Sequence, residues 1–186
     1  QAAAKDAQGL PVPGSTLNKT EQQLVIRGLL ESCDALDGVQ DGLIFNRTAC
    51  NFDPRSLACP AGQAENCLAP AKAEALAKAA AGPVDSRGVQ VYANFLLDTG
   101  IDDLGGIPGI ITGTGTAPVG PSVATSLTQD VDAEFIVATA TDAAIGDSMS
   151  YQLSSFAANG GKQIFYHGVS DPWFSAMDTV NYYQNM

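Results

Sequence analysis

The sequence is poor in basic residues and has no long apolar run. Nine Lys and Arg stand against twenty Asp and Glu, so the formal net charge of the 186 residues at pH 7 is −11. Nucleic acids and anionic membranes attract clusters of Lys and Arg, so we expect neither a nucleic acid nor a membrane as a partner. No stretch approaches the roughly 18 consecutive apolar residues of a transmembrane helix.

The sequence also lacks the motif that carries the nucleophile in many serine hydrolases. Gly-x-Ser-x-Gly does not occur, and the nearest segment, Gly146 to Ser150, lacks the second glycine. The chain has a single histidine, His167, which lies four residues before Asp171. These residues therefore contain no recognisable nucleophile, although the length and an apolar content of 45% are sufficient for one sizeable core.

Four cysteines lie close together, the first at Cys33 and the last at Cys67. An even number in a short region indicates disulfides, and four cysteines allow three pairings. A structural zinc site is disfavoured, because no Cys-x-x-Cys pair occurs and the only histidine lies a hundred residues further on. Disulfides form in an oxidising compartment, so we expect a secreted or periplasmic protein.

The densest group of acidic residues follows the first cysteine. Asp34, Asp37 and Asp41 lie within eight residues, next to Gly38 and Gly42. Three carboxylates this close together repel one another, whereas Ca²⁺ keeps all of them ionised and accepts about six to eight oxygen ligands. The spacing is not that of an EF-hand. The group nevertheless predicts a cation site.

An extended loop would suit calcium better than a helix here. From Asp37 onward every second residue points the same way in such a loop, so the carboxylates of Asp37 and Asp41 would alternate with the carbonyls of Val39 and Leu43. The alternative is a solvated helix face, because Asp34, Asp37 and Asp41 occupy positions i, i+3 and i+7, which lie on one side of a helix. Two glycines within five residues disfavour the helix, since each costs about 1 kcal/mol.

Helix signals recur along the chain. Thr20 and Gln23 fit a capping box, and the apolar stripe that follows leads to Cys33. A second helix is predicted from Pro70 to the stop signal Gly82-Pro83. Residues 84–128, rich in Gly, Thr and Pro, permit no assignment. Shorter helices are predicted over residues 133–144, over residues 153–158 and after the capping residue Ser175.

The strongest strand candidate lies near the C-terminus, over residues 162–167. Its continuous apolar run, Ile164 to Tyr166, is typical of a parallel strand that is buried on both faces. Catalytic groups in open α/β sheets gather after such strands, and Asp171 lies there. An acid at this place would accept a hydrogen bond from an imidazole and hold its tautomer. The alternative is an ordinary Asp-Pro turn without a catalytic role.

Two blocks of the sequence resemble one enzyme family. The run CDALDGVQDGLI from Cys33, followed by Cys50, the segment NFDP and Leu57-Ala58-Cys59, resembles the calcium-binding lid of the tannase and feruloyl esterase family. The block GGKQIFYHGVSDP, residues 160–172, is similar to the catalytic-aspartate segment of the same family. With a weak middle, the resemblance extends over nearly the whole chain.

The resemblance implies an α/β fold, in which part of an α/β-hydrolase sheet carries a lid domain stabilised by disulfides and Ca²⁺. It implies an N-terminal segment and helix over residues 1–32, the lid over 33–150, and a core segment with the catalytic-acid loop over 151–186. The residue roles that it implies are the disulfides Cys33–Cys50 and Cys59–Cys67, the Ca²⁺ ligands Asp34, Asp37 and Asp41 with the carbonyls of Val39 and Leu43, and the triad acid Asp171.

The activity that the resemblance implies is serine-type hydrolysis of aromatic acyl esters, such as feruloyl or galloyl esters. The family's nucleophile and catalytic histidine lie in segments that this sequence does not contain, and His167 matches a Tyr-His-Gly segment instead. We therefore expect a middle piece of a larger hydrolase, whose partners are the N- and C-terminal segments of the same enzyme and a small aromatic ester. The alternative is a secreted binding module, stabilised by Ca²⁺ and disulfides, without catalysis.

Overall fold

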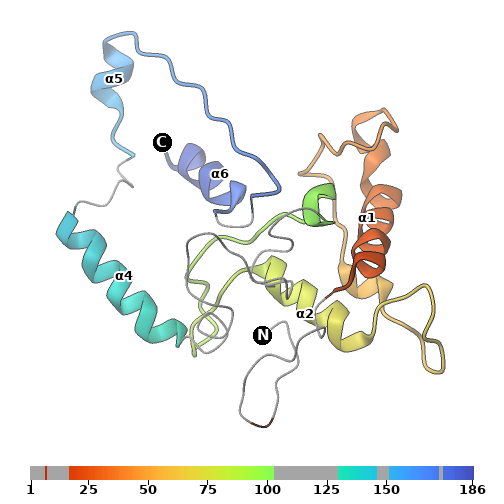
Figure 1. Cartoon of the computed structure of the whole chain (residues 1–186). Coiled ribbons are helices and arrows are strands. Elements are labelled where there is room, and N and C mark those ends of the chain that lie inside the picture. The colour runs from red at the N-terminus through yellow and green to blue at the C-terminus, as the bar shows by residue number, and fades with distance from the viewer. Residues whose placement is uncertain (1–6, 8–16, 103–129, 146–150, 172–173) are drawn as a thin grey trace.

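A computed structural model describes residue 7 and residues 17–102, 130–145, 151–171 and 174–186. The described part is built from helices and long connecting segments, and α1 and α4 lie on opposite sides of the molecule (Figure 1). The α-helices are α1 (Lys19–Cys33), α2 (Pro70–Ala81), α4 (Val131–Ile145), α5 (Ser154–Ala158) and α6 (Ala176–Asn185). The 3₁₀ helices are η1 (Asp34–Asp37), η2 (Pro54–Leu57) and η3 (Thr99–Asp102).

The N-cap of helix α1 lies two residues earlier than the sequence predicts, so the predicted capping box is wrong. The N-cap is Asn18, whose Oδ1 accepts a hydrogen bond of 3.0 Å from the amide of Glu21. The Glu21 carboxylate in turn accepts one of 2.8 Å from the amide of Asn18. Asn is a better N-cap than Thr, so Thr20 lies inside the helix.

The main core lies where α1, α2 and η3 pack together. Val25 of α1 and Leu76 of α2 have no exposed surface, and Ile101 of η3 is 4% exposed. At the edge of this core the Lys72 Nζ lies 2.7 Å from a carboxylate oxygen of Glu21, which joins the two helices. The buried members of the core are Leu17, Val25, Leu68, Ala73, Leu76, Leu97 and Ile101.

Both disulfides have the predicted pairing. Cys33, at the end of α1, is bonded to Cys50, and Cys59 is bonded to Cys67. Between them the chain is loop apart from η2, as predicted, and the Cys59 amide donates a hydrogen bond of 2.7 Å to the carbonyl of Leu68. Two crosslinks hold this region, but Phe52, Leu57 and Ala58 also pack against the main core, so the expectation of a region without core contacts is wrong.

The predicted strand does not form, and the described residues contain no sheet. Residues 161–168 have no regular secondary structure, and Ile164 and Tyr166 are 88% and 94% exposed. A parallel strand needs a neighbour that satisfies its backbone groups, and the described part of the chain provides none here. The described residues thus show isolated bridges, Ala58 with Leu68 and Val84 with Gln90, in place of the predicted α/β sheet.

The remaining helices agree with the sequence. Helix α2 has the predicted bounds and ends at Gly82, whose φ of +82° favours glycine. Helices α4 and α5 match their predicted ranges within two residues, and Ser175 caps α6 by accepting a hydrogen bond of 3.1 Å from the amide of Met177. The segment Gly146 to Ser150 lies outside the described residues. Among those described, no helix has the length and apolar character that crossing a membrane requires.

Truncating the core should destabilise the chain in proportion to burial. We expect Leu76→Ala to lower the free energy of unfolding by about 2–5 kcal/mol, because it leaves a cavity among α1, α2 and η3. The matched control is Leu36→Ala, since Leu36 is 40% exposed and its loss should cost about 0.5 kcal/mol or less. Urea denaturation followed by circular dichroism measures both, and equal effects would contradict this description of the core.

Candidate functional site

The acidic loop after α1 folds around its own carboxylates. The Oδ1 of Asp34 accepts hydrogen bonds of 3.3 Å and 3.1 Å from the amides of Asp41 and Gly42, on the far side of the loop. Gly38 and Gly42 make this reversal possible, because their φ values of +97° and +82° favour glycine. The helix alternative holds for one short turn only, since η1 contains Asp34 and Asp37 and ends at Gly38.

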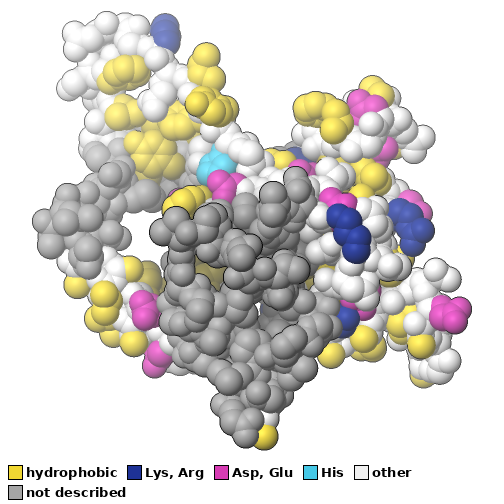
Figure 2. Space-filling model, in the orientation of Figure 1, with side chains coloured by type: hydrophobic (Ala, Val, Ile, Leu, Met, Phe, Trp, Pro, Cys, Tyr) yellow, Lys and Arg dark blue, Asp and Glu magenta, His cyan; other side chains and the backbone are white. Residues whose placement is uncertain are grey.

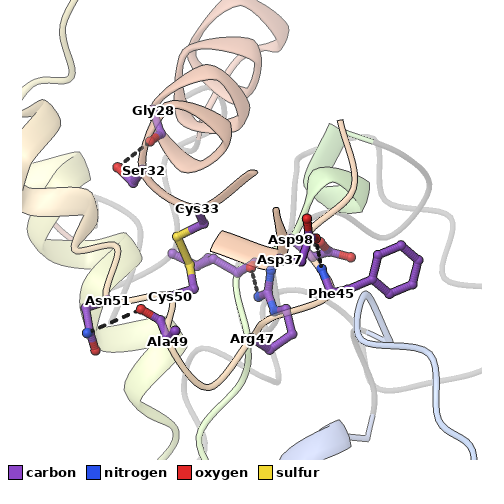
Figure 3. The surroundings of a disulfide bond; sticks show 11 residues. Gly28, Ser32, Cys33, Asp37, Phe45, Arg47, Ala49, Cys50, Asn51 and Asp98 are labelled. Carbon is purple, nitrogen blue, oxygen red and sulfur yellow. Dashed lines mark hydrogen bonds and ion pairs between the residues drawn. A yellow bond between two sulfur atoms is a disulfide. The ribbon is translucent and has the colours of Figure 1, made fainter. Parts of the chain in front are cut away.

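The other two carboxylates also turn toward backbone amides. Asp37 accepts hydrogen bonds from the amides of Val39 at 3.0 Å and Phe45 at 3.1 Å, and the latter contact closes the loop (Figure 3). Asp41 accepts one of 3.0 Å from the amide of Leu43. Every carboxylate of the predicted calcium site is therefore involved in shaping the loop.

The donor chemistry of this loop fits Ca²⁺, but the carboxylates do not converge. Within the described residues no Lys, Arg or His forms an ion pair with Asp34, Asp37 or Asp41, so three negative charges stay uncompensated. Carboxylate and carbonyl oxygens are the ligands that Ca²⁺ prefers. In the part of the chain that is described, however, no three His, Cys, Asp or Glu residues form a group that could hold a metal ion. The calcium site stays a prediction.

Asp171 lies in a turn directly after the extended segment that ends at Gly168. Its amide donates a hydrogen bond of 3.1 Å to the carbonyl of Gly168, and its Oδ1 accepts one of 3.0 Å from the amide of Phe174. The Nε2 of His167 lies 3.6 Å from its Oδ2. Backbone contacts on both sides thus orient the carboxylate of the predicted triad acid.

His167 joins this turn to α6. Its Nε2 lies 3.2 Å from the carbonyl of Phe174, and its Nδ1 lies 2.6 Å from the hydroxyl of Thr179. A carbonyl only accepts, so Nε2 donates the contact to Phe174, and Nδ1 shares a hydrogen bond with the hydroxyl of Thr179. Both ring nitrogens are occupied inside the chain, which is the arrangement of a structural histidine.

The structure adds an ion pair that the sequence did not reveal. The Nη1 of Arg47 lies 3.4 Å from the Oδ1 of Asp98, and both side chains are 15% exposed. Burial lowers the pKa of Arg47, and the charge of Asp98 opposes that change. The guanidinium also donates to the carbonyl of Leu97. The scarcity of basic residues is a weak signal for Arg47, but nothing in the sequence identifies a partner fifty positions away.

A cavity of about 560 Å³ opens beside the turn that contains Asp171. In Figure 2 hydrophobic side chains gather next to the histidine. The volume is typical of small-molecule sites, and polar groups are few along its wall. The lining includes Arg47, Asn94, Phe165, His167, Met177 and Val180.

Comparisons with known proteins show the family of this chain. A sequence profile described as tannase and feruloyl esterase matches residues 5–143. The chain belongs to the tannase and feruloyl esterase family. It is 30% identical, over 236 aligned positions, to mono(2-hydroxyethyl) terephthalate hydrolase from Piscinibacter sakaiensis, with 100% of this chain and 39% of that protein covered. It is 28% identical to a probable feruloyl esterase B-2 from Aspergillus flavus, with coverages of 97% and 36%.

Solved structures show the same relationship at the level of the fold. The chain superposes on feruloyl esterase B from Aspergillus oryzae with a TM-score of 0.71 at 21% identity, over 91% of this chain and 36% of that structure. The fold is therefore that of one part of a feruloyl esterase of the α/β-hydrolase type. This member of the family spans less than two fifths of the length of these relatives.

Removing the His167 imidazole should cost stability. We expect His167→Ala to lower the free energy of unfolding by about 1–3 kcal/mol, because it removes the contacts to Thr179 and Phe174. Thr179→Val removes only the first of these contacts and should cost about 1 kcal/mol. Urea denaturation gives both values. Wild-type stability in both variants would show that His167 does not hold α6 to the turn.

Proposed function

We propose that this chain is part of a serine carboxylic ester hydrolase that acts on aromatic acyl esters of the feruloyl or galloyl type. Family membership supports an ester hydrolase, and the named relatives are a terephthalate ester hydrolase and a probable feruloyl esterase. The observation that carries the proposal is Asp171, which lies after an extended apolar segment with its carboxylate oriented by the amide of Phe174.

The proposed role of Asp171 is to orient a catalytic imidazole. It accepts a hydrogen bond from that ring, holds the correct tautomer and stabilises the imidazolium that forms when the base takes the serine proton. The activated serine attacks the ester carbonyl, the alcohol leaves, and water hydrolyses the acyl-serine intermediate. The serine and the histidine come from segments of the same hydrolase outside these residues.

The exposed segment 161–168 supports the proposal that the fold requires further segments of the same hydrolase. Ile164 and Tyr166 are almost fully exposed, although apolar runs of this kind belong in sheets covered on both faces. Neighbouring strands of the same hydrolase would satisfy the backbone of this segment and cover its side chains. We therefore keep the missing N- and C-terminal segments as the proposed partners.

We also propose that the loop after α1 binds one Ca²⁺. The ligands would be the carboxylates of Asp34, Asp37 and Asp41 and the carbonyls of Val39 and Leu43. The uncompensated charge of the three carboxylates supports this site, and binding would replace their hydrogen bonds to backbone amides. A divalent ion there contributes stability to the lid. Two disulfides are compatible with the secreted or periplasmic location that we propose for the enzyme.

The second candidate is a binding module that Ca²⁺ and disulfides stabilise and that has no catalysis of its own. It is favoured by the absence of a Gly-x-Ser-x-Gly motif and of a second histidine from these 186 residues. The turn that orients Asp171 favours the esterase, because a binding module has no need for it. The mass of the purified natural protein distinguishes the two, since only the esterase requires further segments.

Calcium should raise the melting temperature of this chain, and a chelator should reverse the increase. A ligand at about 100 times its dissociation constant adds about 2.7 kcal/mol to the stability. We expect Asp37→Asn to abolish the response, whereas Glu65→Ala, which removes an exposed carboxylate elsewhere, should leave it intact. A wild-type chain whose melting curve ignores both calcium and the chelator would refute the calcium site.

The isolated chain should not hydrolyse methyl ferulate or methyl gallate, because it lacks a nucleophile with a positioned base. In the full-length esterase, Asp171→Asn should lower kcat by about 10⁴, the loss seen when the triad acid of a serine protease is changed in this way. His167→Asn should retain most of the activity. Turnover by the isolated chain that His167→Asn abolishes would show that the roles are assigned to the wrong residues.

A further inference from the structure

We propose that the lid segment 92–98 holds the turn around Asp171 at both of its ends, and that Asp98 is a positioning residue for catalysis. The inference rests on the proposed role of Asp171 and extends it to residues of the lid that precede it by more than seventy positions. The geometry that supports it consists of two separate anchors, at Ser170 and at Ser175.

The first anchor lies immediately before the acid. The hydroxyl of Ser170 donates a hydrogen bond of 2.8 Å to the Oδ2 of Asp98. Ser170 is the chain neighbour of Asp171, so a shift of this hydroxyl moves the backbone from which the acid projects. The other oxygen of Asp98 pairs with Arg47 at 3.4 Å, and the carboxylate is thereby held between two partners.

The second anchor lies where the turn meets α6. The amide of Ser175 donates a hydrogen bond of 3.1 Å to the hydroxyl of Tyr92, and the Ser175 hydroxyl donates to the carbonyl of Asn94. Ser175 is 1% exposed and also caps α6. Asp171 and Phe174 therefore lie between two anchors that both belong to segment 92–98.

The segment itself is attached to the buried core through η3. Asp98 precedes η3, which contacts α1 and contributes the buried Ile101 to the core. Arg47 lies three residues before Cys50, which is bonded to the end of α1 (Figure 3). The orientation of Asp171 is thus coupled to the disulfide-bonded loop through the chain Arg47, Asp98 and Ser170.

Close packing confirms that Ser170 fits against the lid with no spare room. A Cβ added at Gly100 would lie 2.5 Å from the Ser170 hydroxyl and 2.7 Å from its Cβ. Contacts under about 3.0 Å force a shift, so Gly100→Ala changes the position of Ser170 relative to η3. Ser170→Ala, in contrast, removes the hydrogen bond to Asp98 without adding any atom. The two variants therefore disturb the first anchor in independent ways.

The test uses the full-length esterase with methyl ferulate as substrate. We expect Ser170→Ala and Gly100→Ala each to lower kcat by about 10- to 100-fold, because small misplacements of a catalytic group have effects of this size. KM should stay within about twofold, since neither residue is required for ground-state binding in this proposal. The matched control is Asp102→Asn, which alters the same 3₁₀ helix but contacts Lys19 and Gln23 instead of the turn.

The pH profile separates positioning from a loss of stability. A carboxylate close to the catalytic imidazole raises the pKa of that ring, so a displaced Asp171 lowers it. The neutral base then persists to lower pH, and the acid limb of kcat/KM moves to lower pH in Ser170→Ala and Gly100→Ala. Asp102→Asn should keep the wild-type profile even where its melting temperature falls.

Asp171→Asn, measured in parallel, distinguishes failure of the inference from failure of the proposed function. Wild-type kcat in Asp171→Asn would overturn the role of the acid itself. A large loss in Asp171→Asn together with wild-type kcat and pH profile in Ser170→Ala would overturn the positioning role of segment 92–98. If Gly100→Ala does not fold, as its melting curve would show, Ser170→Ala alone decides the question.

Discussion

The disulfide between Cys33 and Cys50 is the constraint on which the rest of the structure depends. It joins the end of α1 to a point seventeen residues further on, and for loops of this length the chain-entropy model gives about 3 kcal/mol. The loop that it closes contains the three carboxylates and Arg47. Because α1 is buried against α2 and η3, the crosslink fixes the acidic loop relative to the core. The Arg47–Asp98 pair in turn connects this loop to the segment that contains Asp98.

The acidic loop and the turn at Asp171 are the two chemical features of this family member, and the contacts of Arg47 and Asp98 connect them. The acidic loop concentrates negative charge that no Lys, Arg or His of the described residues pairs with, while the turn at Asp171 is formed by hydrogen bonds to backbone groups and has His167 beside the carboxylate. Between them lies a half-buried ion pair, whose guanidinium has a pKa lowered by burial. Removal of either partner of such a pair leaves the other charge poorly solvated, so this contact is sensitive to substitution.

Local rules were sufficient for much of the secondary structure. Helix α2 has its predicted bounds because Pro70 and Gly82 act within one turn of the helix ends. The predicted N-cap of α1 is wrong because Thr20 and Asn18 both satisfy the capping pattern. Only the stronger intrinsic preference of Asn for the N-cap position favours Asn18. The strand at residues 162–167 failed for a different reason. Strands are completed by hydrogen bonds to neighbours, and the described residues contain none for this segment.

The sequence by itself determined the helices, the predicted disulfide pairing, the acidic loop and the place of Asp171 directly after an apolar segment, because each depends on residues close together in the chain or on a run that resembles the family. The tertiary structure alone decided which carboxylates turn to which amides, that His167 binds Thr179, and that Asp98 joins Arg47 to Ser170. The contacts of His167 and Asp98 link positions 12 to 72 residues apart, whereas those of the acidic loop link positions 2 to 8 residues apart. The packing of η3 against α1 positions Asp98 for its contacts with Arg47 and Ser170, and no local pattern encodes contacts between residues so far apart in the chain.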